Sequence, residues 1–578
     1  MSRRLLRLAF LLVPVAALVA SCHHGGVRPT VDIGTYLGGE TRLVIAEPVF
    51  GAHGMVASNS GLASEAGAEI LRQGGNAVDA AVATGFALAV TYPGAGNIGG
   101  GGFMNIHMAD GRTAAIDYRE VAPLAATRNM YVDPATGKLT DKSIIGHLAS
   151  GVPGSVAGMA EALSKYGSMS LAAVMAPAIR LARQGFIVDS SLFRSLRSDK
   201  KSLMQFAGND LFYPNGEPLA PGARLVQAEL ARTLELIAAK GPAGFYEGDV
   251  ADALVAEMKR GGGIITHEDL RRYKPEWRTP IRSTYRGYTL FTMPPASSGG
   301  ITMTETMNIL ETFGALPKYG SAAYSHLLAE AFRRSFIDRN AKLGDPAFVK
   351  VPIEQLTSKA YARELAGTID RAQATRTPAF KGGSEPDHTT HYSVADNSGN
   401  VVATTTTLNG GYGSGVWIPR GGFFMNNEMD DFAAQPGTAN MFGLVQGEAN
   451  AVVPGKRMLS AMAPTIVLGK DGKVLLVVGA AGGPRIITTT TQVILNVIEH
   501  NMSLADAMRA PRLHHQSLPD TLRYEDGAFS AAVADSLRAM GHALLRTNGL
   551  ANANGIMRVN GGWIGVREPR SAGKAVGY

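Results

Sequence analysis

Residues 387–431 read DHTTHYSVADNSGNVVATTTTLNGGYGSGVWIPRGGFFMNNEMDD and decide the fold of this chain. They follow a connector rich in Pro, Gly and Ser, PAFKGGSEPD, at 378–387. β-Branched residues predict one strand over Thr389–Asp396 and a second over Val401–Leu408, with a turn over Asn397–Asn400 between them. The local prediction is therefore a β-hairpin whose first strand begins where the connector ends.

One face of this hairpin is unusually polar for strands that only pack. Because side chains alternate along a strand, Thr405, Thr407 and Asn409 share a face. A threonine hydroxyl is a poor nucleophile without a neighbouring base, but a threonine at the very N-terminus of a chain carries its own base, the α-amine. The connector that ends before Thr389 would fit a chain cut between His388 and Thr389. Taken alone, a threonine in a strand is most often structural.

Composition places the chain among ordinary globular proteins. Its 578 residues are 45% hydrophobic and 18% charged, enough for one large core or for two to three domains. The net charge is +7 and the isoelectric point is near 9.3, yet Lys and Arg are scattered and no basic run is interleaved with aromatic residues. We therefore expect no nucleic-acid partner, while a basic protein suits a small anionic substrate.

The first 22 residues have the pattern of an export signal. A start with three arginines is followed by an apolar core too short to span a bilayer as a permanent helix, and then by small residues. The end of this segment, Leu18-Val-Ala-Ser-Cys22, resembles a bacterial lipobox. We therefore expect an exported, periplasmic or cell-surface protein that is anchored to the membrane only through a lipid on Cys22, with residues 23–42 as a tether. The alternative is a plain signal peptide with a chance cysteine, although Cys22 is the only cysteine and excludes an intrachain disulfide.

Hydrophobic periodicity outside the hairpin predicts helices that alternate with strands. The helical stretches are 62–71, 77–90, 230–239, 251–260, 322–336 and 486–500, and the strand-like ones are 104–116, 474–479 and 556–566. Strands covered by helices are typical of a layered domain. The string Gly94–Gly99 matches the G-x-G-x-x-G pattern, but it follows a helix, so we interpret it as a close crossing of backbones and not as a dinucleotide site.

Several long motifs resemble the γ-glutamyltranspeptidase family over about 43–578. The matches are Asp117-Tyr-Arg-Glu120, Met293–Gly300, Thr389–Val394, Asn426–Phe432, Gly443–Val445 with Ala449–Ala451, and Gly482-Gly483. The resemblance implies an α+β fold, the four-layer αββα sandwich of N-terminal-nucleophile hydrolases. It also implies self-cleavage into a large subunit, 43–388, and a small catalytic subunit, 389–578, which form a heterodimer without a cofactor or a metal.

The resemblance assigns the chemistry to the hairpin and to one glycine pair. Thr389 would attack its own upstream peptide bond during maturation, and afterwards the γ-amide of a substrate to give an acyl-enzyme. Thr407 would orient Thr389, and Thr405 would assist maturation. Gly482 and Gly483 would offer backbone N–H groups to the oxyanion.

The same resemblance implies a site for the two charges of an α-amino acid. Arg119 would hold the α-carboxylate with its planar fork, and the α-ammonium would be held by Asn409, Glu428 and Asp431. Relatives usually carry two adjacent serines beside the carboxylate, whereas this chain has Ser460 followed by Ala461, so one hydroxyl is missing. Phe442 stands where many relatives have a tyrosine on a lid.

The implied activity is γ-glutamyl transfer from glutathione and related γ-glutamyl amides to water, amino acids or short peptides. Two alternatives stay open: an acylase of the same fold that acts on another acyl amide, and an unprocessed binding protein anchored by Cys22. Histidines occur as pairs at 23 and 24, 388 and 391, and 514 and 515, but these pairs lack the partners of a zinc site. Ser198-x-x-Lys201 lacks the companion Lys-Thr-Gly motif of penicillin-recognising enzymes.

Overall fold

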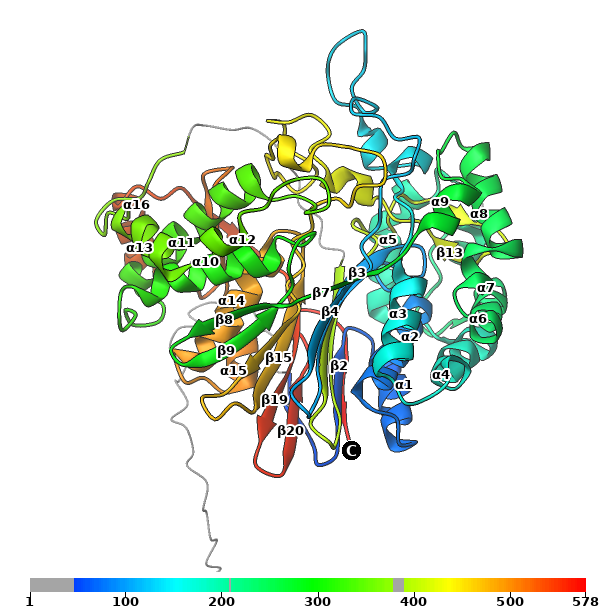
Figure 1. Ribbon diagram of the computed structural model, residues 1–578, viewed down its shortest axis with the longest axis horizontal. Coiled ribbons are helices and arrows are strands. Elements are labelled where there is room, and N and C mark those ends of the chain that lie inside the picture. Colours follow the sequence, from blue (N-terminus) through cyan, green and yellow to red (C-terminus); the bar gives the residue numbers. More distant parts are fainter. Residues whose placement is uncertain (1–45, 207–208, 378–388) are drawn as a thin grey trace, which may run out of the picture.

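Two seven-stranded antiparallel sheets lie face to face at the centre of the computed structural model (Figure 1), which describes residues 46–206, 209–377 and 389–578. The hairpin sheet has the order β21-β2-β10-β11-β3-β4-β7, with β2 at Met55–Ser58, β3 at Gly101–His107, β4 at Thr113–Asp117, β7 at Glu276–Arg278, β10 at Thr389–Ala395, β11 at Val401–Thr407 and β21 at Lys574–Gly577. The second sheet has the order β1-β20-β19-β15-β14-β9-β8, with β1 at Val49–Gly51, β8 at Ile281–Tyr285, β9 at Tyr288–Thr292, β14 at Thr465–Leu468, β15 at Val474–Ala481, β19 at Asn552–Val559 and β20 at Gly562–Val566.

Helices form the two outer layers. Beside the hairpin sheet lie α1 (Gly61–Arg72), α2 (Ala77–Thr91), α3 (Ser155–Tyr166), α4 (Leu171–Gln184), α5 (Ser190–Leu203), α6 (Ala228–Lys240), α7 (Ala243–Tyr246), α8 (Gly248–Arg260) and α9 (His267–Arg272) (Figure 1). Beside the second sheet lie α10 (Gly299–Glu311), α11 (Ala322–Lys342), α12 (Ile353–Leu356), α13 (Lys359–Gly367), α14 (Arg485–Ile498), α15 (Leu504–Arg509) and α16 (Ala531–Ala539). The predicted four-layer αββα sandwich is confirmed.

Short strands complete the fold outside the two large sheets. They pair as β5 (Phe186–Ile187) with β6 (Arg224–Leu225), as β12 (Trp417–Ile418) with β13 (Phe423–Phe424), and as a three-stranded sheet of β16 (Leu513–His514), β17 (Leu522–Glu525) and β18 (Leu544–Thr547). Among the residues that the structure describes, no helix is both long enough and apolar enough to cross a membrane.

The apolar composition of helix α2 matches its buried position in the fold. Every one of its residues is buried, because it packs between α1 and strands β10 and β11. Its Ala- and Val-rich sequence therefore has no polar face, as expected for a helix that is buried on all sides. Asn76 and Asp79 form a capping box at its N-terminus, which satisfies backbone N–H groups that the helix itself leaves unpaired.

The register of the hairpin decides where its polar face points. Thr389 lies opposite Thr407, and His391 lies opposite Thr405. His391 points between the two sheets, because a side chain at Gly479 of β15 would meet its ring at 2.4 Å, whereas Tyr392 points to the opposite face and contacts α2 at Gly85. Thr389, at the start of β10, and Thr407, at the end of β11, therefore lie at the edge of the layer between the two sheets.

The glycine string before β3 packs against backbone on several sides. A Cβ atom at Gly96, Gly99 or Gly100 would lie 2.1–2.3 Å from a backbone carbonyl oxygen of α2, of β13 or of Thr407. Only glycine fits at such distances. The predicted close crossing is confirmed, and it fixes β3 beside the residue that supports Thr389.

Candidate active site

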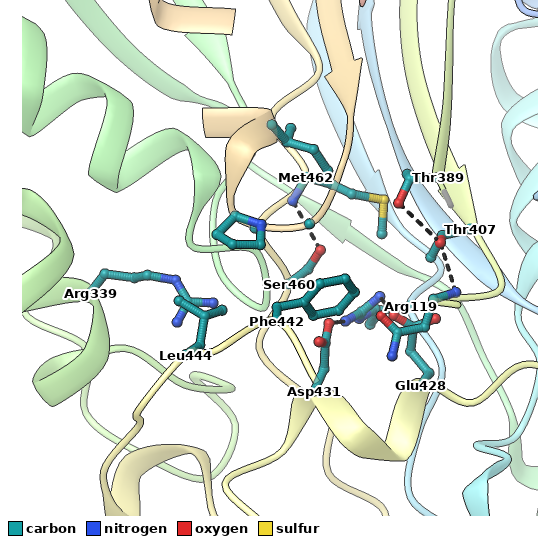
Figure 2. Close-up of a pocket in the computed structure, with 15 residues that line it drawn as sticks. Arg119, Arg339, Thr389, Thr407, Glu428, Asp431, Phe442, Leu444, Ser460 and Met462 are labelled. Atoms are coloured by element: carbon teal, nitrogen blue, oxygen red, sulfur yellow. Dashed lines mark hydrogen bonds and ion pairs between the residues drawn. The ribbon is translucent and has the colours of Figure 1, made fainter. Parts of the chain in front are cut away.

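A single cavity collects residues from distant parts of the chain (Figure 2). Thr389 comes from the start of β10 and Thr407 from the end of β11, while Arg119 follows β4. A short 3-10 helix, η5 (Glu428–Asp431), brings two acids. The lining residues are Arg119, Arg339, Thr389, Thr407, Asn409, Glu428, Asp431, Phe442, Leu444, Ser460, Ala461, Met462, Gly483, Pro484 and Ile486.

The two threonines at the strand ends form the centre of the site. Their hydroxyl oxygens are 3.3 Å apart, and the Thr407 hydroxyl accepts a hydrogen bond from the backbone N–H of Asn409 at 2.8 Å. That bond fixes the Thr407 hydroxyl, which in turn restrains the position of Thr389. Asn409 itself adopts a left-handed backbone conformation, with φ of 76°, which asparagine tolerates better than most residues.

Thr405 lies outside the cavity, although the sequence placed it on the same face. Its hydroxyl is 2.9 Å from Nδ1 of His391, whose Nε2 is 3.0 Å from the hydroxyl of Ser393. Burial lowers the pKa of His391 to about 3, so the ring is neutral and one nitrogen accepts while the other donates. Any influence of Thr405 on Thr389 therefore passes through its neighbours on the strands.

The glycine pair between β15 and α14 presents free backbone donors. Gly482 and Gly483 have φ angles of 136° and 56°, which side chains rarely adopt. Within the described parts of the chain neither backbone N–H has a hydrogen-bond partner. The ring of Phe442 packs against Gly483, where a Cβ atom would lie 2.7 Å from its edge. Gly483 lines the same cavity as Thr389, and two adjacent unpaired N–H groups are the donors that an oxyanion hole needs.

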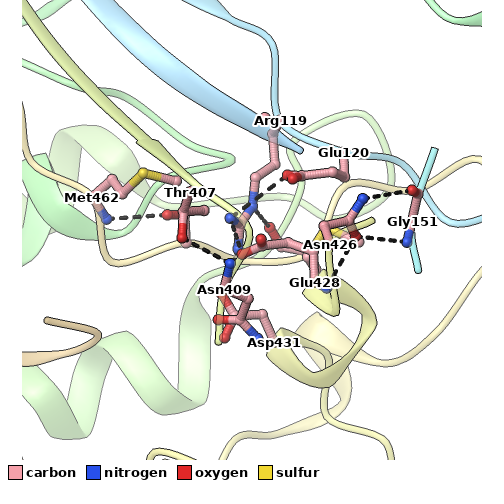
Figure 3. A network of polar contacts seen from close by, with 12 residues as sticks. Arg119, Glu120, Gly151, Thr407, Asn409, Asn426, Glu428, Asp431 and Met462 are labelled. Atoms are coloured by element: carbon pink, nitrogen blue, oxygen red, sulfur yellow. Dashed lines mark hydrogen bonds and ion pairs between the residues drawn. The ribbon is translucent and has the colours of Figure 1, made fainter. Parts of the chain in front are cut away.

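Arg119 also lines the cavity, paired with both acids of η5 (Figure 3). One terminal nitrogen of its guanidinium contacts Glu428 and the other contacts Asp431, while Nε donates to the backbone oxygen of Met458 at 3.2 Å. All three charged side chains are almost completely buried. The residues predicted to hold a carboxylate and an ammonium thus pair with each other.

Burial and charge compete in this cluster. Burial by itself lowers the pKa of Arg119, but Glu428 and Asp431 raise it above its ordinary value. Burial also raises the pKa of both acids, and the attraction of Arg119 only partly offsets that effect. The acids are therefore poorly stabilised by Arg119 alone, and a second cation between them would favour their charged form.

Of the remaining predicted binding residues, Ser460 and Ala461 lie on the loop before β14, and Asn409 follows β11. The hydroxyl of Ser460 accepts from the backbone N–H of Met462 at 3.1 Å, and Ala461 is only 8% exposed but lines the cavity. Asn409 donates its side-chain amide to the backbone oxygen of Asn427 at 3.0 Å, which leaves its amide oxygen as an acceptor. The cavity is therefore lined by hydroxyl, amide, guanidinium and carboxylate groups together with apolar side chains.

Arg339 of α11 lines the cavity and was not predicted. Its guanidinium donates to Ser298 Oγ at 3.1 Å, to Gln446 Oε1 at 3.2 Å and to Asn340 Oδ1 at 2.9 Å, and no carboxylate pairs with it among the described residues. Burial and the nearby Arg119 lower its pKa to about 10, although Asp431 opposes that shift. The sequence does not indicate that Arg339 lines the cavity, because charged residues at helical spacing usually form a solvated face of a helix.

Within the described residues, the alternative sites considered from the sequence are not formed. No group of three or more His, Cys, Asp or Glu side chains that could hold a metal occurs in the described part of the chain. His514 contacts Thr488 and Gln516, and His515 faces Asp520. Ser198 and Lys201 lie on the exposed side of α5. Cys22 lies outside the described residues.

Fold and site together define a class of protein. An αββα sandwich in which a central strand begins with a threonine, supported by a second threonine in a cavity that Gly483 also lines, is the arrangement of an N-terminal-nucleophile hydrolase. A sequence model described as Gamma-glutamyltranspeptidase matches residues 63–578. The chain belongs to the γ-glutamyltranspeptidase family, as its motifs predicted.

Relatives with other names share the fold. The chain is 47% identical over 569 residues to the glutathione hydrolase proenzyme of Escherichia coli (strain K12), with 97% of each chain covered. It is 42% identical over 523 residues to the Acylase ACY 1 proenzyme of Pseudomonas sp. (strain SE83), covering 89% of this chain and 91% of that one. A crystal structure of cephalosporin acylase from Bacillus halodurans superposes with a TM-score of 0.81 at 29% identity, over 92% of this chain and 97% of the other.

Replacing Arg119 with lysine is expected to raise KM for a γ-glutamyl anilide by about 10- to 100-fold and to change maturation far less. Lysine keeps the positive charge but is a single point donor, so it cannot contact Glu428 and Asp431 and also present a fork to a carboxylate. Steady-state kinetics measure the effect. Arg278→Lys is the matched control, because Arg278 pairs with Asp117 and does not line the cavity. An unchanged KM in Arg119→Lys would remove Arg119 from substrate binding.

Proposed function

We propose that this enzyme cuts itself before Thr389 and then transfers the γ-glutamyl group of glutathione and related amides to water, an amino acid or a short peptide. One observation carries the proposal: a paired threonine hydroxyl and a cluster of one arginine and two carboxylates share the same cavity. Nucleophile and charge pattern are therefore within reach of one small substrate. The names of the relatives, glutathione hydrolase proenzymes among them, support the same substrate class.

Maturation follows from the position of Thr389. Its hydroxyl oxygen attacks the carbonyl carbon of residue 388, the peptide C–N bond breaks, and the nitrogen takes up the hydroxyl proton, so that an ester replaces the amide. Water then hydrolyses the ester and leaves a carboxylate on the large subunit and a free α-amine on Thr389. This amine, with an ordinary pKa of about 7.7–8, is a base suited to neutral pH.

Catalysis uses the same hydroxyl a second time. The α-amine accepts the proton of Thr389 Oγ1 as the oxygen attacks the γ-carbonyl carbon, and the N–H groups of Gly482 and Gly483 would stabilise the oxyanion. The amine of the leaving group takes up that proton as the amide bond breaks. Water or an acceptor amine then attacks the ester and restores Thr389.

On binding, the charged groups of the substrate would replace the ion pairing between Arg119 and the two acids of η5. An α-carboxylate would take the place of one η5 acid on the Arg119 fork and would also accept from Ser460, while an α-ammonium would insert between Glu428, Asp431 and the amide oxygen of Asn409. A zwitterion thus divides an existing ion pair into two new ones. Each charge of the cluster would then face an opposite charge of the substrate, which offsets the cost of burying it.

Intact mass of the purified protein tests the proposal directly. We expect two chains, the smaller of which begins at Thr389, and hydrolysis of a γ-glutamyl anilide by the pair. A single chain of full mass would instead favour the unprocessed binding protein.

We also propose that the protein is exported and anchored through a lipid on Cys22. Cys22→Ser is expected to move the protein from the membrane fraction to the soluble fraction, because a lipid chain contributes about 0.8 kcal/mol of membrane affinity per buried CH₂. Fractionation followed by immunoblotting measures the shift, with Ser21→Ala as the matched control. Acyl labelling that fails on the unmodified chain would contradict the anchor.

A further inference from the structure

The segment Ala374–Thr377 enters the connector that ends before Thr389, and it is held firmly without being part of a helix or strand. Its polar groups bond almost entirely to side chains and backbone from elsewhere. Ala374 N–H donates to the backbone oxygen of Met540 at 2.7 Å. Thr375 donates to Glu330, and Thr377 donates to Asp520. Each contact links the segment to a residue far away in the sequence.

The first holding group is a buried charge cluster on α11. Glu330 accepts from the backbone N–H of Thr375 at 3.1 Å and from its hydroxyl at 2.6 Å. The same carboxylate pairs with Arg333 and Arg334, at 3.2 and 2.6 Å. Glu330 is inaccessible to solvent and both arginines are buried. These hydrogen bonds and the arginines overcome the effect of burial and lower the pKa of Glu330 to about 2, so the carboxylate is charged.

The second holding group lies beyond the predicted cut, between β16 and β17. Asp520 accepts from the backbone N–H of Thr377 at 2.8 Å, and its other oxygen pairs with Arg333 at 2.7 Å and faces His515 at 3.3 Å. Arg333 also donates to the hydroxyl of Thr377. Asp520 therefore joins the segment to the small subunit, while Glu330 joins it to the large one.

We propose that Glu330, Arg333 and Asp520 form a clamp that positions the connector for self-cleavage before Thr389. This clamp rests on the maturation proposed above. Its residues are positioning residues, which act through the connector and do not contact the reacting atoms. Because Asp520 and Met540 belong to the small subunit, the clamp fixes the upstream end of the connector to the same body that carries Thr389. Eleven residues, 378–388, separate the two fixed points.

Fixing both ends matters because cleavage depends on orientation. Thr389 is bonded to the peptide that it attacks, so proximity is already given, and the rate depends on how often the carbonyl of residue 388 faces the hydroxyl. A free upstream end would spread the connector over many more conformations. A misplacement of about 1 Å can cost reacting groups on the order of 100-fold. The clamp lies outside the cavity, so it has no direct part in later turnover.

Two variants test the clamp from opposite sides. Asp520→Ala removes the small-subunit acceptor, and Thr377→Pro removes the backbone N–H donor without changing the buried charges. Both are expected to slow conversion of the precursor about tenfold, measured by gel after pulse-labelled cell-free synthesis, and to leave kcat and KM of the matured enzyme unchanged. Asp520→Glu, which keeps the charge, should recover most of the rate. Asp535→Asn is the charge-matched control, because its exposed carboxylate pairs with Arg538 on α16 and with no other described residue.

Amide exchange supplies a readout that is independent of cleavage. In an uncut Thr389→Ala background, the amides of Thr375 and Thr377 should be protected, and Asp520→Ala should remove the protection of Thr377. Unprotected amides, or variants that mature at the unmodified rate, would overturn the clamp. A fall in kcat as large as the fall in maturation rate would also overturn it, because it would indicate general misfolding. An unmodified chain that is never cut before Thr389 would overturn the proposed function, whereas a normal cut with unchanged variant rates overturns the clamp alone.

Discussion

Thr389→Ala is expected to leave one uncut chain and to lower turnover of a γ-glutamyl anilide at least about 10³-fold. The variant loses the hydroxyl that attacks the upstream peptide, and so it never gains the free α-amine. Nucleophile and base are therefore lost through a single substitution. The cavity itself should persist, because the Thr389 side chain makes its one close polar contact in the described residues with the hydroxyl of Thr407. Intact mass and anilide hydrolysis measure the two losses separately.

Thr390→Ala is the matched control for this experiment. Thr390 is the next residue of β10, is equally buried, and points to the other face, where its hydroxyl contacts Asn59. Its loss should affect stability slightly and leave the cut in place. Thr389→Ser retains a hydroxyl and should be cut and active at a lower rate. A Thr389→Ala chain that still matured and hydrolysed the anilide would transfer the nucleophile to another residue.

The hairpin and the glycine crossing were predictable because their signals are local. β-Branched runs interrupted by a turn cluster define β10 and β11 within a few residues, and the strand period already places Thr407 on the polar face. The glycines at 94–100 could also be interpreted from local sequence, because a glycine motif that binds a dinucleotide phosphate follows a strand and this one follows a helix. Local pattern and tertiary structure agree at these positions.

The charges of the site were less predictable because they depend on long-range packing. The motifs included Arg119, Glu428 and Asp431, but they gave no indication that the three side chains pair with one another. Arg339 reaches the site from the middle of α11, where its sequence context resembles any charged helix. Thr405 shares the predicted face, yet it contacts His391 and lies outside the cavity. The strand period fixes the face of a side chain and not the residue that it contacts.

The charged cluster also predicts how strongly the enzyme should select its donor. We expect kcat/KM for a γ-glutamyl anilide to exceed that for the glutaryl anilide, which lacks only the α-amine, by about 10³-fold. Each hydrogen bond to a charged group contributes about 1.5–3 kcal/mol, and two such bonds from the ammonium to Glu428 and Asp431 give that ratio. A site built to bond a polar group rejects the analogue without it because its own buried groups are left unpaired.

Asp431→Asn should lower the ratio of kcat/KM between the two anilides, while the protein still folds. The amide keeps the shape of the side chain but removes one of the charges that the ammonium would pair with, so the ratio between the two anilides should fall to about 30 or less. Asp430→Asn is the matched control, because Asp430 is the adjacent buried acid of η5 and accepts from Ser143 and from Met441 without lining the cavity. The ratio should stay near that of the unmodified enzyme in this control.

The same comparison decides between the two enzymes that the family offers. An acylase for a plain acyl chain has no use for an ammonium site, so it should hydrolyse the glutaryl anilide as fast as the γ-glutamyl one or faster. Relatives named acylases share about the same fraction of this sequence as several glutathione hydrolases, so identity alone does not separate the activities. In the proposed complex Ala461 offers no hydroxyl to the carboxylate, whereas Asn409, Glu428 and Asp431 would all bind the ammonium. Equal turnover of the two anilides would therefore contradict the transpeptidase assignment, whereas a strong preference that collapses in Asp431→Asn would establish that the buried acids select the α-amine.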